Sequence, residues 1–563
     1  MRKLVTKALR ILAPFAVTFI IFYPFAVRGL DIHHDGTAFK PALDVAAGQT
    51  LFKDTFTQYG PLTTWIQAFF IKLLWSFSGP SLHSIKLATV VFYSLSAVLL
   101  VELWSMLLPR RLAWMSLLIW ISLAPFLAPW LVFLPWSSVY ALFFQLLAAF
   151  LFLMSLHCLE KNDGVSRNLT LASTAFFSGV SCVLTFWCRI PIGLLILLGL
   201  GGVAFLYLIS HLRSKSAWQF FGFFKLGALL TFGVIGLYLH FRGSLVYGYA
   251  QTVVWPAQWA RGTGGGNFGN VTSLLLRRRN ETVLLLATLL FARPLLNWLS
   301  KKSEYTATTL VAAIGFSLFF RYPKPFYQAG FFTLIPVFAL VMTGWVLWQN
   351  RKSWKLLAWL ALVMSSWAQF YPMNDPRHVY WAITPGIGFF IYWMHRWLGN
   401  HPRWTEILVS VWLFSNLIWL GPGAFQKLTR EYRETESPSL KGVRVLPHQA
   451  EALEPLFTAI RFAETNTGAR PIIVEGPDAF YSTLTRRLEN SNRIPQIWKN
   501  TGLHETHFDA QGMDFIQRNK PWIISESTDI PFIRPKGLEA YQRSATISDP
   551  DRGWETTLWI FKD

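Results

Sequence analysis

The sequence predicts a polytopic α-helical membrane protein with a small α/β soluble domain at its C-terminus. Three observations support this fold class. The chain of 563 residues is 53% hydrophobic and only 14% charged, whereas soluble domains average about 25% charged residues. Apolar runs of about 20 residues, long enough to span a bilayer, recur up to residue 421. Beyond that point they stop, and 19 of the 30 acidic residues follow.

The apolar runs predict about thirteen membrane helices. They lie near residues 11–29, 84–108, 112–130, 137–157, 169–187, 190–210, 219–240, 281–299, 306–320, 327–348, 355–371, 379–397 and 404–421. The first run follows basic residues, as a signal peptide would. It is too long for one and has no small-residue cleavage site, so we interpret it as a membrane helix.

Basic residues predict the orientation of these helices. Lys and Arg precede the first run and then occupy every second loop, which is typical of the cytoplasmic side. We therefore expect a multi-pass protein of the inner cell membrane with a cytoplasmic N-terminus. The loops 30–83, 131–136, 188–190, 241–280, 321–326 and 372–378 and the C-terminal domain then lie outside. The net charge of +21 reflects this topology, because no basic stripe or module indicates nucleic-acid binding.

The change in composition at residue 421 predicts two domains, a transmembrane domain over 1–421 and a soluble domain over 422–563. In the second domain, residues 471–477 and 521–527 have the pattern of strands, and 448–465 and 509–519 have the pattern of helices. The three cysteines, Cys158, Cys182 and Cys188, lie in or beside apolar runs and are interpreted as small buried hydrophobic residues.

The first outer loop is long but has the pattern of folded structure. Residues 37–47 predict a short helix closed by Gly48, and Pro61 can open a second helix. In the second helix, large apolar residues and polar residues take opposite faces, which is typical of a helix in the membrane interface. These helices would hold Asp31–Gly36 and Asp54–Gly60 near the lipid surface.

Four of the six acidic residues expected outside before residue 421 lie in this loop. The run Asp31-x-His33-His34-Asp35 places two carboxylates and two imidazoles within five residues. Carboxylates suit general-base chemistry on a hydroxyl, and the same set suits a divalent cation such as Mg²⁺ or Mn²⁺. A structural alternative is that Asp31 only caps a helix and the histidines are interfacial polar residues.

Other outer loops supply cations. They are Arg189 in WCRIPIG, Arg321 and Lys324 in FFRYPKPFY, and Arg377 and His378 beside Asp375 in the segment after residue 370. One such cation fits a side chain that reaches lipid headgroups, but several on the side of the carboxylates indicate an anionic partner such as a phosphate. The Gly-rich loop 241–280 fits a mobile lid and lacks the residues of a nucleotide-binding loop.

Three motifs resemble the GT-C superfamily of membrane glycosyltransferases. They are DIHHDG, KDTFTQYGPLTTW and QFYPMNDPRHVYWAITPG. The likeness is to the bacterial branch related to protein mannosyltransferases and lipid A aminoarabinose transferases, and it covers roughly residues 1–421. The resemblance implies a GT-C-like fold and transfer of a hexosyl or pentosyl group from a polyprenyl-phosphate donor. The acceptor would be a glycan, lipid or protein outside the cytoplasm.

The resemblance also implies residue roles. Asp35 is the first choice for the base or metal-orienting group, Asp31 is the second, and Asp54 matches the second acidic point. The substrate-binding candidates are His33, His34, Gln58, Tyr59, Arg189, Arg321, Lys324, Asp375, Arg377 and His378, with the cations among them facing the departing phosphate. Asp31, His33 and Asp35 are the candidate metal ligands. The chain has His-His-Asp where the mannosyltransferases have an Asp-Glu pair, which leaves the base and any metal open.

A transporter or flippase of a lipid-linked or anionic substrate is the main alternative. Transporters place ionisable groups near the bilayer midplane and often have repeated halves. Here the acids are expected at one membrane face and no internal duplication is visible, which favours the transferase.

Overall fold

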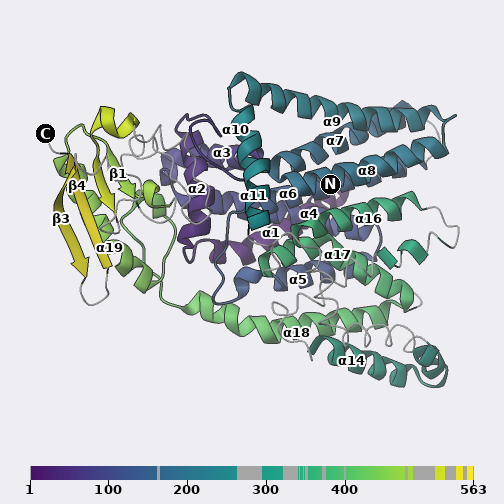
Figure 1. Cartoon of the computed structure of the whole chain (residues 1–563). Coiled ribbons are helices and arrows are strands. Elements are labelled where there is room, and N and C mark those ends of the chain that lie inside the picture. Colours follow the sequence, from purple (N-terminus) through teal and green to yellow (C-terminus); the bar gives the residue numbers. More distant parts are fainter. Residues whose placement is uncertain are drawn as a thin grey trace.

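A bundle of long helices forms most of the molecule, and a small four-stranded sheet lies at one end of it (Figure 1). The fold is known from a computed structural model. It describes residues 2–160, 165–262, 294–320, 353–370, 376–398, 401–475, 480–485, 514–525, 541–549 and 554–561, and a few positions between 340 and 348.

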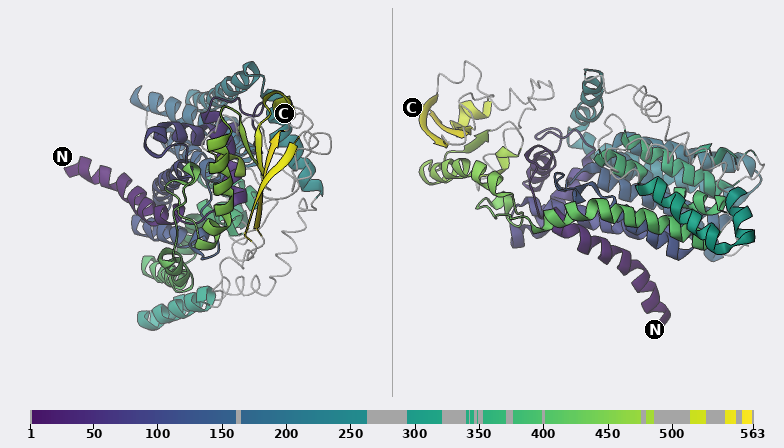
Figure 2. Two further views of the ribbon diagram at one scale, coloured as in Figure 1. Left: turned by 90° about the vertical axis from the view of Figure 1, so that its left-hand side faces the viewer. Right: turned by 90° about the horizontal axis from the view of Figure 1, so that it is seen from below.

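The bundle is made of helices that come from the apolar runs of the sequence. They are α1 (Arg2–Ala26), α4 (Leu82–Ser105), α5 (Arg110–Ser122), α6 (Ser137–Leu159), α7 (Val165–Cys188), α8 (Ile190–Ser210), α9 (Lys215–Phe241), α14 (Glu304–Phe320), α16 (Trp354–Trp367), α17 (Pro376–Trp397) and α18 (Pro402–Thr429). Shorter helices follow α9, namely α10 (Leu245–Tyr249), a π-helical turn (Ala250–Val254) and α11 (Trp255–Gly262). Figure 2 shows α1 leaving the side of the bundle.

Six of the described helices, α4, α6, α7, α8, α9 and α18, are long and apolar enough to cross a membrane. The segment Arg10–Ala26 of α1 is a shorter apolar helix. Two of the thirteen predicted spans, 281–299 and 327–348, lie largely outside the described residues. The membrane character of the bundle therefore agrees with the prediction, and the exact number of spans stays a prediction.

The first outer loop folds as two helices, α2 (Ile32–Ala46) and α3 (Pro61–Ser78). The predicted start of α3 at Pro61 is confirmed. The predicted start of α2 near residue 37 is wrong, because Asp31 caps a helix that begins five residues earlier. Thus the acidic run is the first helical turn and not an irregular segment, while Gly48 follows the end of the helix with a φ of +99°.

Helix α3 has its polar face turned inward. Thr63, Thr64 and Gln67 are buried, and Gln67 donates a hydrogen bond to the Pro135 carbonyl oxygen at 2.7 Å. The apolar side chain of Phe77 is 80% exposed. An exposed apolar face on a chain with membrane-length helices is expected to contact lipid. The two faces of α3 are therefore confirmed, and its interfacial position stays a prediction.

The C-terminal segment, which follows the end of α18 at Thr429, forms a mixed sheet in the order β1-β2-β4-β3. Helix α19 (Pro447–Asn466) packs against this sheet. The predicted strands appear as β1 (Ile472–Glu475) and β2 (Trp522–Ser525), which pair in parallel. Two unpredicted strands, β3 (Tyr541–Asp549) and β4 (Trp554–Phe561), complete the sheet in antiparallel pairings. Helix α18 continues to Thr429, past the predicted domain boundary at residue 421.

The C-terminal segment packs directly on the first outer loop. Gly29 donates a backbone hydrogen bond to the Arg444 carbonyl at 2.8 Å, and the Gln449 amide donates to the Leu30 carbonyl at 2.9 Å. Side chains of α2 and of the sheet share one apolar cluster. The sheet therefore lies at the end of the bundle that carries the acidic run (Figures 1 and 2).

Candidate functional site

The first turn of α2 places the two carboxylates of the acidic run one helical turn apart. Asp31 is the N-cap, and its side chain accepts a hydrogen bond from the His34 backbone N–H at 2.9 Å. Asp35 accepts a hydrogen bond from the Asp31 backbone N–H at 3.0 Å. Carboxylates are favourable at a helix N-terminus, which has free N–H donors and a positive dipole end. Asp31 therefore caps α2, as the structural alternative expected. Any chemical role of Asp31 depends on the side chains around it.

Asp31 and His34 form a close pair at the protein surface. The His34 Nδ1 atom lies 2.9 Å from the second carboxylate oxygen of Asp31, and both side chains are partly exposed. Burial raises the pKa of Asp31, but hydrogen bonds from His34 and the charges of His34 and Arg377 outweigh it and lower the pKa to about 2. Asp31 therefore stays ionised at neutral pH and can orient the His34 ring.

Asp35 is buried and paired with Lys86 of α4. A carboxylate oxygen of Asp35 lies 3.1 Å from the Lys86 ammonium, and neither side chain is exposed. Lys86 also donates to the Gly29 carbonyl at 3.0 Å. Burial raises the pKa of Asp35 to about 6, against the lowering effects of Lys86 and the Asp31 N–H. The other oxygen, Oδ1, has no hydrogen-bond partner within the described chain.

Trp136, the N-cap of α6, brings together candidates that are far apart in the sequence. Its ring lies 5.0 Å from the His34 ring and 5.1 Å from the His378 ring, centroid to centroid. The Arg377 guanidinium lies over the same ring at 5.4 Å. His33 contacts His34 edge to face. The structure thus places the acidic run beside the start of α17.

Arg189 lies at the turn between α7 and α8 and donates a hydrogen bond to Ser138, two residues beyond Trp136. The segment with Gln58 and Tyr59 leads to the same turn, because Gly60 packs on the Trp187 backbone. A Cβ at Gly60 would lie 2.0 Å from the Trp187 carbonyl oxygen. Arg189 therefore borders the cluster around Trp136.

Asp54 belongs to a different cluster. It accepts a hydrogen bond from the Thr50 backbone N–H at 2.7 Å. Burial raises the pKa of Asp44, and the charge of Asp54 adds to this rise. Asp44 is buried and pairs with Lys40 at 2.5 Å and with Thr55 at 2.6 Å. Because Asp44 lies nine residues along α2 from Asp35, about 13 Å at 1.5 Å per residue, this cluster stabilises the far end of α2.

Three predicted candidates, Arg321, Lys324 and Asp375, lie outside the described residues, and so does the predicted Gly-rich lid beyond residue 262.

A metal at the acidic run would need free ligand atoms. Within the described ranges, no group of three or more His, Cys, Asp or Glu side chains is arranged to hold a metal ion. The Asp31 oxygens face His34, and Asp35 faces Lys86. The candidate set Asp31, His33 and Asp35 does not fit a metal ion in this arrangement, and a divalent cation stays a prediction.

Sequence reasoning missed Lys86 and Trp136. Lys86 is a charged residue within a run otherwise suited to a membrane helix, and such a residue is a site candidate on general grounds. Trp136 has no comparable signal, because 27 tryptophans are spread over the chain. Only the fold reveals that its ring lies between the acidic run and α17.

Comparisons with known proteins give likenesses of shape only. No protein-family model matches the chain, and no curated protein matches it. The Archaeoglobus fulgidus oligosaccharyltransferase in its apo form has 12% identity and a TM-score of 0.49, over 92% of this chain and 69% of its own. The AglB enzyme of that organism, solved with an inhibitory peptide and a dolichol-phosphate, has 13% identity and a TM-score of 0.48, over 92% and 70%.

ArnT from Cupriavidus metallidurans, bound to undecaprenyl phosphate, has 11% identity and a TM-score of 0.48, over 98% of both chains. All of these TM-scores lie below 0.5. We therefore base the functional proposal on the residues of this chain.

Proposed function

We propose that this protein is a glycosyltransferase that moves a sugar from a polyprenyl-phosphate donor to an acceptor at the non-cytoplasmic face of the membrane. The observation that carries the proposal is the Asp31–His34 pair, with Arg377 close enough to lower the pKa of Asp31. The pair lies at the end of a bundle of membrane-length helices. A lipid-linked substrate would present its headgroup at this level, with its tail beside the helices.

The chemistry needs a proton acceptor and cations. The acceptor hydroxyl attacks the anomeric carbon while the bond from that carbon to the phosphate oxygen breaks, and its electron pair leaves with the phosphate. The hydroxyl proton passes to the base. Asp31 would hold His34 by Nδ1, so that Nε2 takes this proton. Arg377 and His378 would stabilise the charge that develops on the phosphate. A single displacement of this kind inverts the anomeric centre.

This proposal gives Asp35 a different role from the one expected first. Asp35 is buried and paired with Lys86, so an acceptor would reach Asp31 and His34 before it. We assign Asp35 as a positioning residue that fixes the Asp31 backbone through the hydrogen bond to its N–H. Asp54 stabilises the other end of α2 in this proposal.

The topology that suits this chemistry has the N-terminus in the cytoplasm and the C-terminal domain in the periplasm. The protein would be a multi-pass protein of the inner membrane. The C-terminal segment contacts the acidic run directly, so both must lie on the same side. The acceptor class, whether glycan, lipid or protein, is the part of the proposal that the experiment has to assign.

The decisive experiment offers purified full-length protein in nanodiscs a panel of polyprenyl-phosphate sugars and a mixture of acceptors. Assays run with and without Mg²⁺ or Mn²⁺, and mass spectrometry follows sugar transfer. Turnover of one donor that is lost in Asp31→Asn supports the proposal. No turnover of any donor, together with flux of a lipid-linked substrate across liposomes, would establish the transporter instead.

A further inference from the structure

A cavity lies where α18 ends, between the bundle and the C-terminal segment. Its volume is about 330 Å³, at the small end of the range of about 300–1,000 Å³ for ligand pockets. The first outer loop contributes Asp31 to its lining, the end of α18 contributes Lys427 and Arg430, and the C-terminal segment contributes Tyr432 and Gln449. Asp31 thus belongs both to the pair with His34 and to this cavity.

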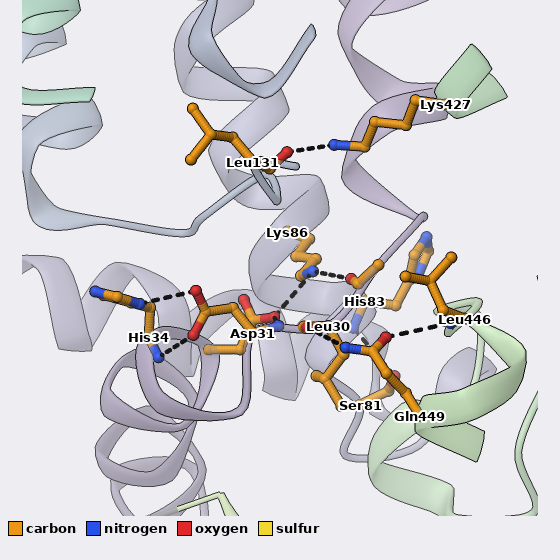
Figure 3. Close-up of polar contacts among 12 residues, drawn as sticks. Leu30, Asp31, His34, Ser81, His83, Lys86, Leu131, Lys427, Leu446 and Gln449 are labelled. Carbon is orange, nitrogen blue, oxygen red and sulfur yellow. Dashed lines mark hydrogen bonds and ion pairs between the residues drawn. The ribbon is translucent and has the colours of Figure 1, made fainter. Parts of the chain in front are cut away.

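Two cations of this cavity have no carboxylate partner within the described part of the chain. Lys427 is 2% exposed, and its ammonium donates to the Leu131 carbonyl oxygen at 2.5 Å (Figure 3) and to the Phe126 carbonyl oxygen at 3.0 Å. The same ammonium lies 5.9 Å from the centre of the Phe25 ring. Arg430 is exposed at the end of α18 and forms no ion pair with any described residue. A buried ammonium that faces only carbonyl oxygens and an aromatic ring is costly unless an anion also approaches it.

Neighbouring arginines of the C-terminal segment differ in this respect. Arg433 pairs with Glu431 and Glu451, and Arg444 pairs with Glu434. The unmatched cations are those that line the cavity. Their charge is therefore available to a ligand.

The opposite wall suits a polar group attached to an anion. The Gln449 amide is fixed by two hydrogen bonds, donating to the Leu30 carbonyl at 2.9 Å and accepting from the Leu446 N–H at 3.2 Å (Figure 3). Tyr432 adds a half-buried aromatic ring with a hydroxyl. Hydroxyl-rich groups are recognised by such fixed amides, carboxylates and aromatic faces.

We propose that this cavity is a subsite for the phosphate-bearing headgroup of a polyprenyl-linked substrate, with Arg430 and Lys427 as its phosphate-binding residues. The attached polar group extends toward Asp31, Tyr432 and Gln449. Arg377 does not line this cavity, so the subsite adds a second set of cations beside Asp31. The C-terminal segment thereby forms one wall of the substrate site. This inference rests on the proposed function for the identity of the lipid.

The test measures equilibrium binding of a radiolabelled polyprenyl phosphate to the full-length protein in nanodiscs. Unlabelled polyprenol and inorganic phosphate serve as competitors. The variant is Arg430→Gln, which removes an exposed charge at the cavity. Arg433→Gln is the matched control, because it removes the same charge outside the cavity. One charge-assisted hydrogen bond corresponds to about a tenfold change in affinity.

We expect Arg430→Gln to weaken polyprenyl-phosphate binding about tenfold, Arg433→Gln to bind like the wild type, and polyprenol to compete poorly. Wild-type affinity in Arg430→Gln, equal loss in both variants, or equal competition by polyprenol would overturn the subsite. Arg430-dependent binding of inorganic phosphate without binding of the lipid would overturn the lipid-linked ligand.

The assay needs no sugar and no turnover, so its failure is separable from that of the proposed function. Sugar transfer by the wild type with unchanged lipid binding in Arg430→Gln would reject only the subsite. Arg430-dependent lipid binding without transfer of any sugar would reject only the transferase.

Discussion

The two acids of the first α2 turn have the same side-chain chemistry and opposite surroundings. Asp31 is partly exposed and hydrogen-bonded to His34, and its pKa is lowered to about 2. Asp35 is buried against Lys86, and its pKa is raised to about 6. A pair of titratable groups whose pKa values are pushed apart by their environments is a common basis for divided roles in catalysis.

The first prediction at this scale concerns Asp31→Asn. Asn is also a good helix N-cap, so α2 should keep its start, while the carboxylate that orients His34 is lost. We expect the transfer rate to fall at least about 100-fold, the usual contribution of general acid–base catalysis, with little change in thermal stability. Glu454→Gln, on the exposed face of α19, is the control for loss of one acid. A wild-type rate in Asp31→Asn would remove Asp31 from the mechanism.

The second prediction concerns pH. The raised pKa means that Asp35 gains a proton as the pH falls through about 6, which ends its ion pair with Lys86. We expect the transfer rate to fall over this range, and Asp35→Asn to be slow at every pH. Asp31 cannot cause the step, because its pKa is about 2.

The stability effect of Asp35 has the opposite sign. A carboxyl whose pKa is higher in the folded than in the unfolded state binds its proton more tightly when folded. Its contribution to stability is therefore largest at low pH and is lost as the pH rises through about 6. A rate that falls together with the melting temperature between pH 7 and 5 would show that unfolding, and not protonation of Asp35, causes the loss.

Helix α3 presents its polar side to the protein and its apolar side outward. Gln67 is 1% exposed and Phe77 is 80% exposed, which reverses the usual pattern of a helix on a soluble protein. A helix that lies in the membrane interface, as predicted for α3, would have this pattern, because its outer face would contact lipid. The polar side can then satisfy buried carbonyls such as that of Pro135.

A prediction at this scale uses Phe77→Cys labelled with a fluorophore. The three native cysteines are buried and should not react in the folded protein. We expect a lipid-attached quencher to quench the label at position 77 strongly and a label introduced by Arg518→Cys, on the C-terminal segment, only weakly. Equal quenching at the two positions would contradict the interfacial placement of α3.

At the scale of the whole molecule, the C-terminal segment holds the acidic run in place. Arg444 pairs with the backbone before α2, Gln449 binds Leu30, and Phe480 packs on Gly36. A Cβ at Gly36 would lie 2.6 Å from the Phe480 backbone nitrogen, so only glycine fits there. The carboxylates therefore depend on a contact with the C-terminal segment, formed by residues more than 400 positions away.

The corresponding prediction is that Gly36→Ala disrupts the packing of α2 against Phe480. We expect a loss of about 1–3 kcal/mol in stability, as for other overpacked positions, and a slower transfer rate. Faster proteolytic release of the C-terminal segment would report the same loss. Gly222→Ala in α9 is the control, because open space surrounds that position and Ala favours a helix interior. Equal effects of the two variants would mean that the contact with the C-terminal segment does not position α2.

The sequence by itself determined the membrane character of the chain and the position of its larger segments. Apolar runs predicted the helices of the bundle, and Pro61 predicted the start of α3. The loss of apolar runs marked the C-terminal segment, in which β1 and β2 were predicted. These features follow from local composition and periodicity, which act within about 20 residues. The strands β3 and β4 escaped prediction because their pattern mixes polar and apolar residues without a clear period.

Only the tertiary structure decided which candidate residues lie together and which lie in separate clusters. Asp31, Asp35 and Asp54 are alike in sequence, yet one faces a histidine and a cavity, one is buried on Lys86, and one belongs to another cluster. Lys86, Trp136 and Arg430 joined the site through contacts between segments far apart in the chain. Burial and charge neighbours set the chemistry of a carboxylate, and a sequence does not contain them until the chain is folded.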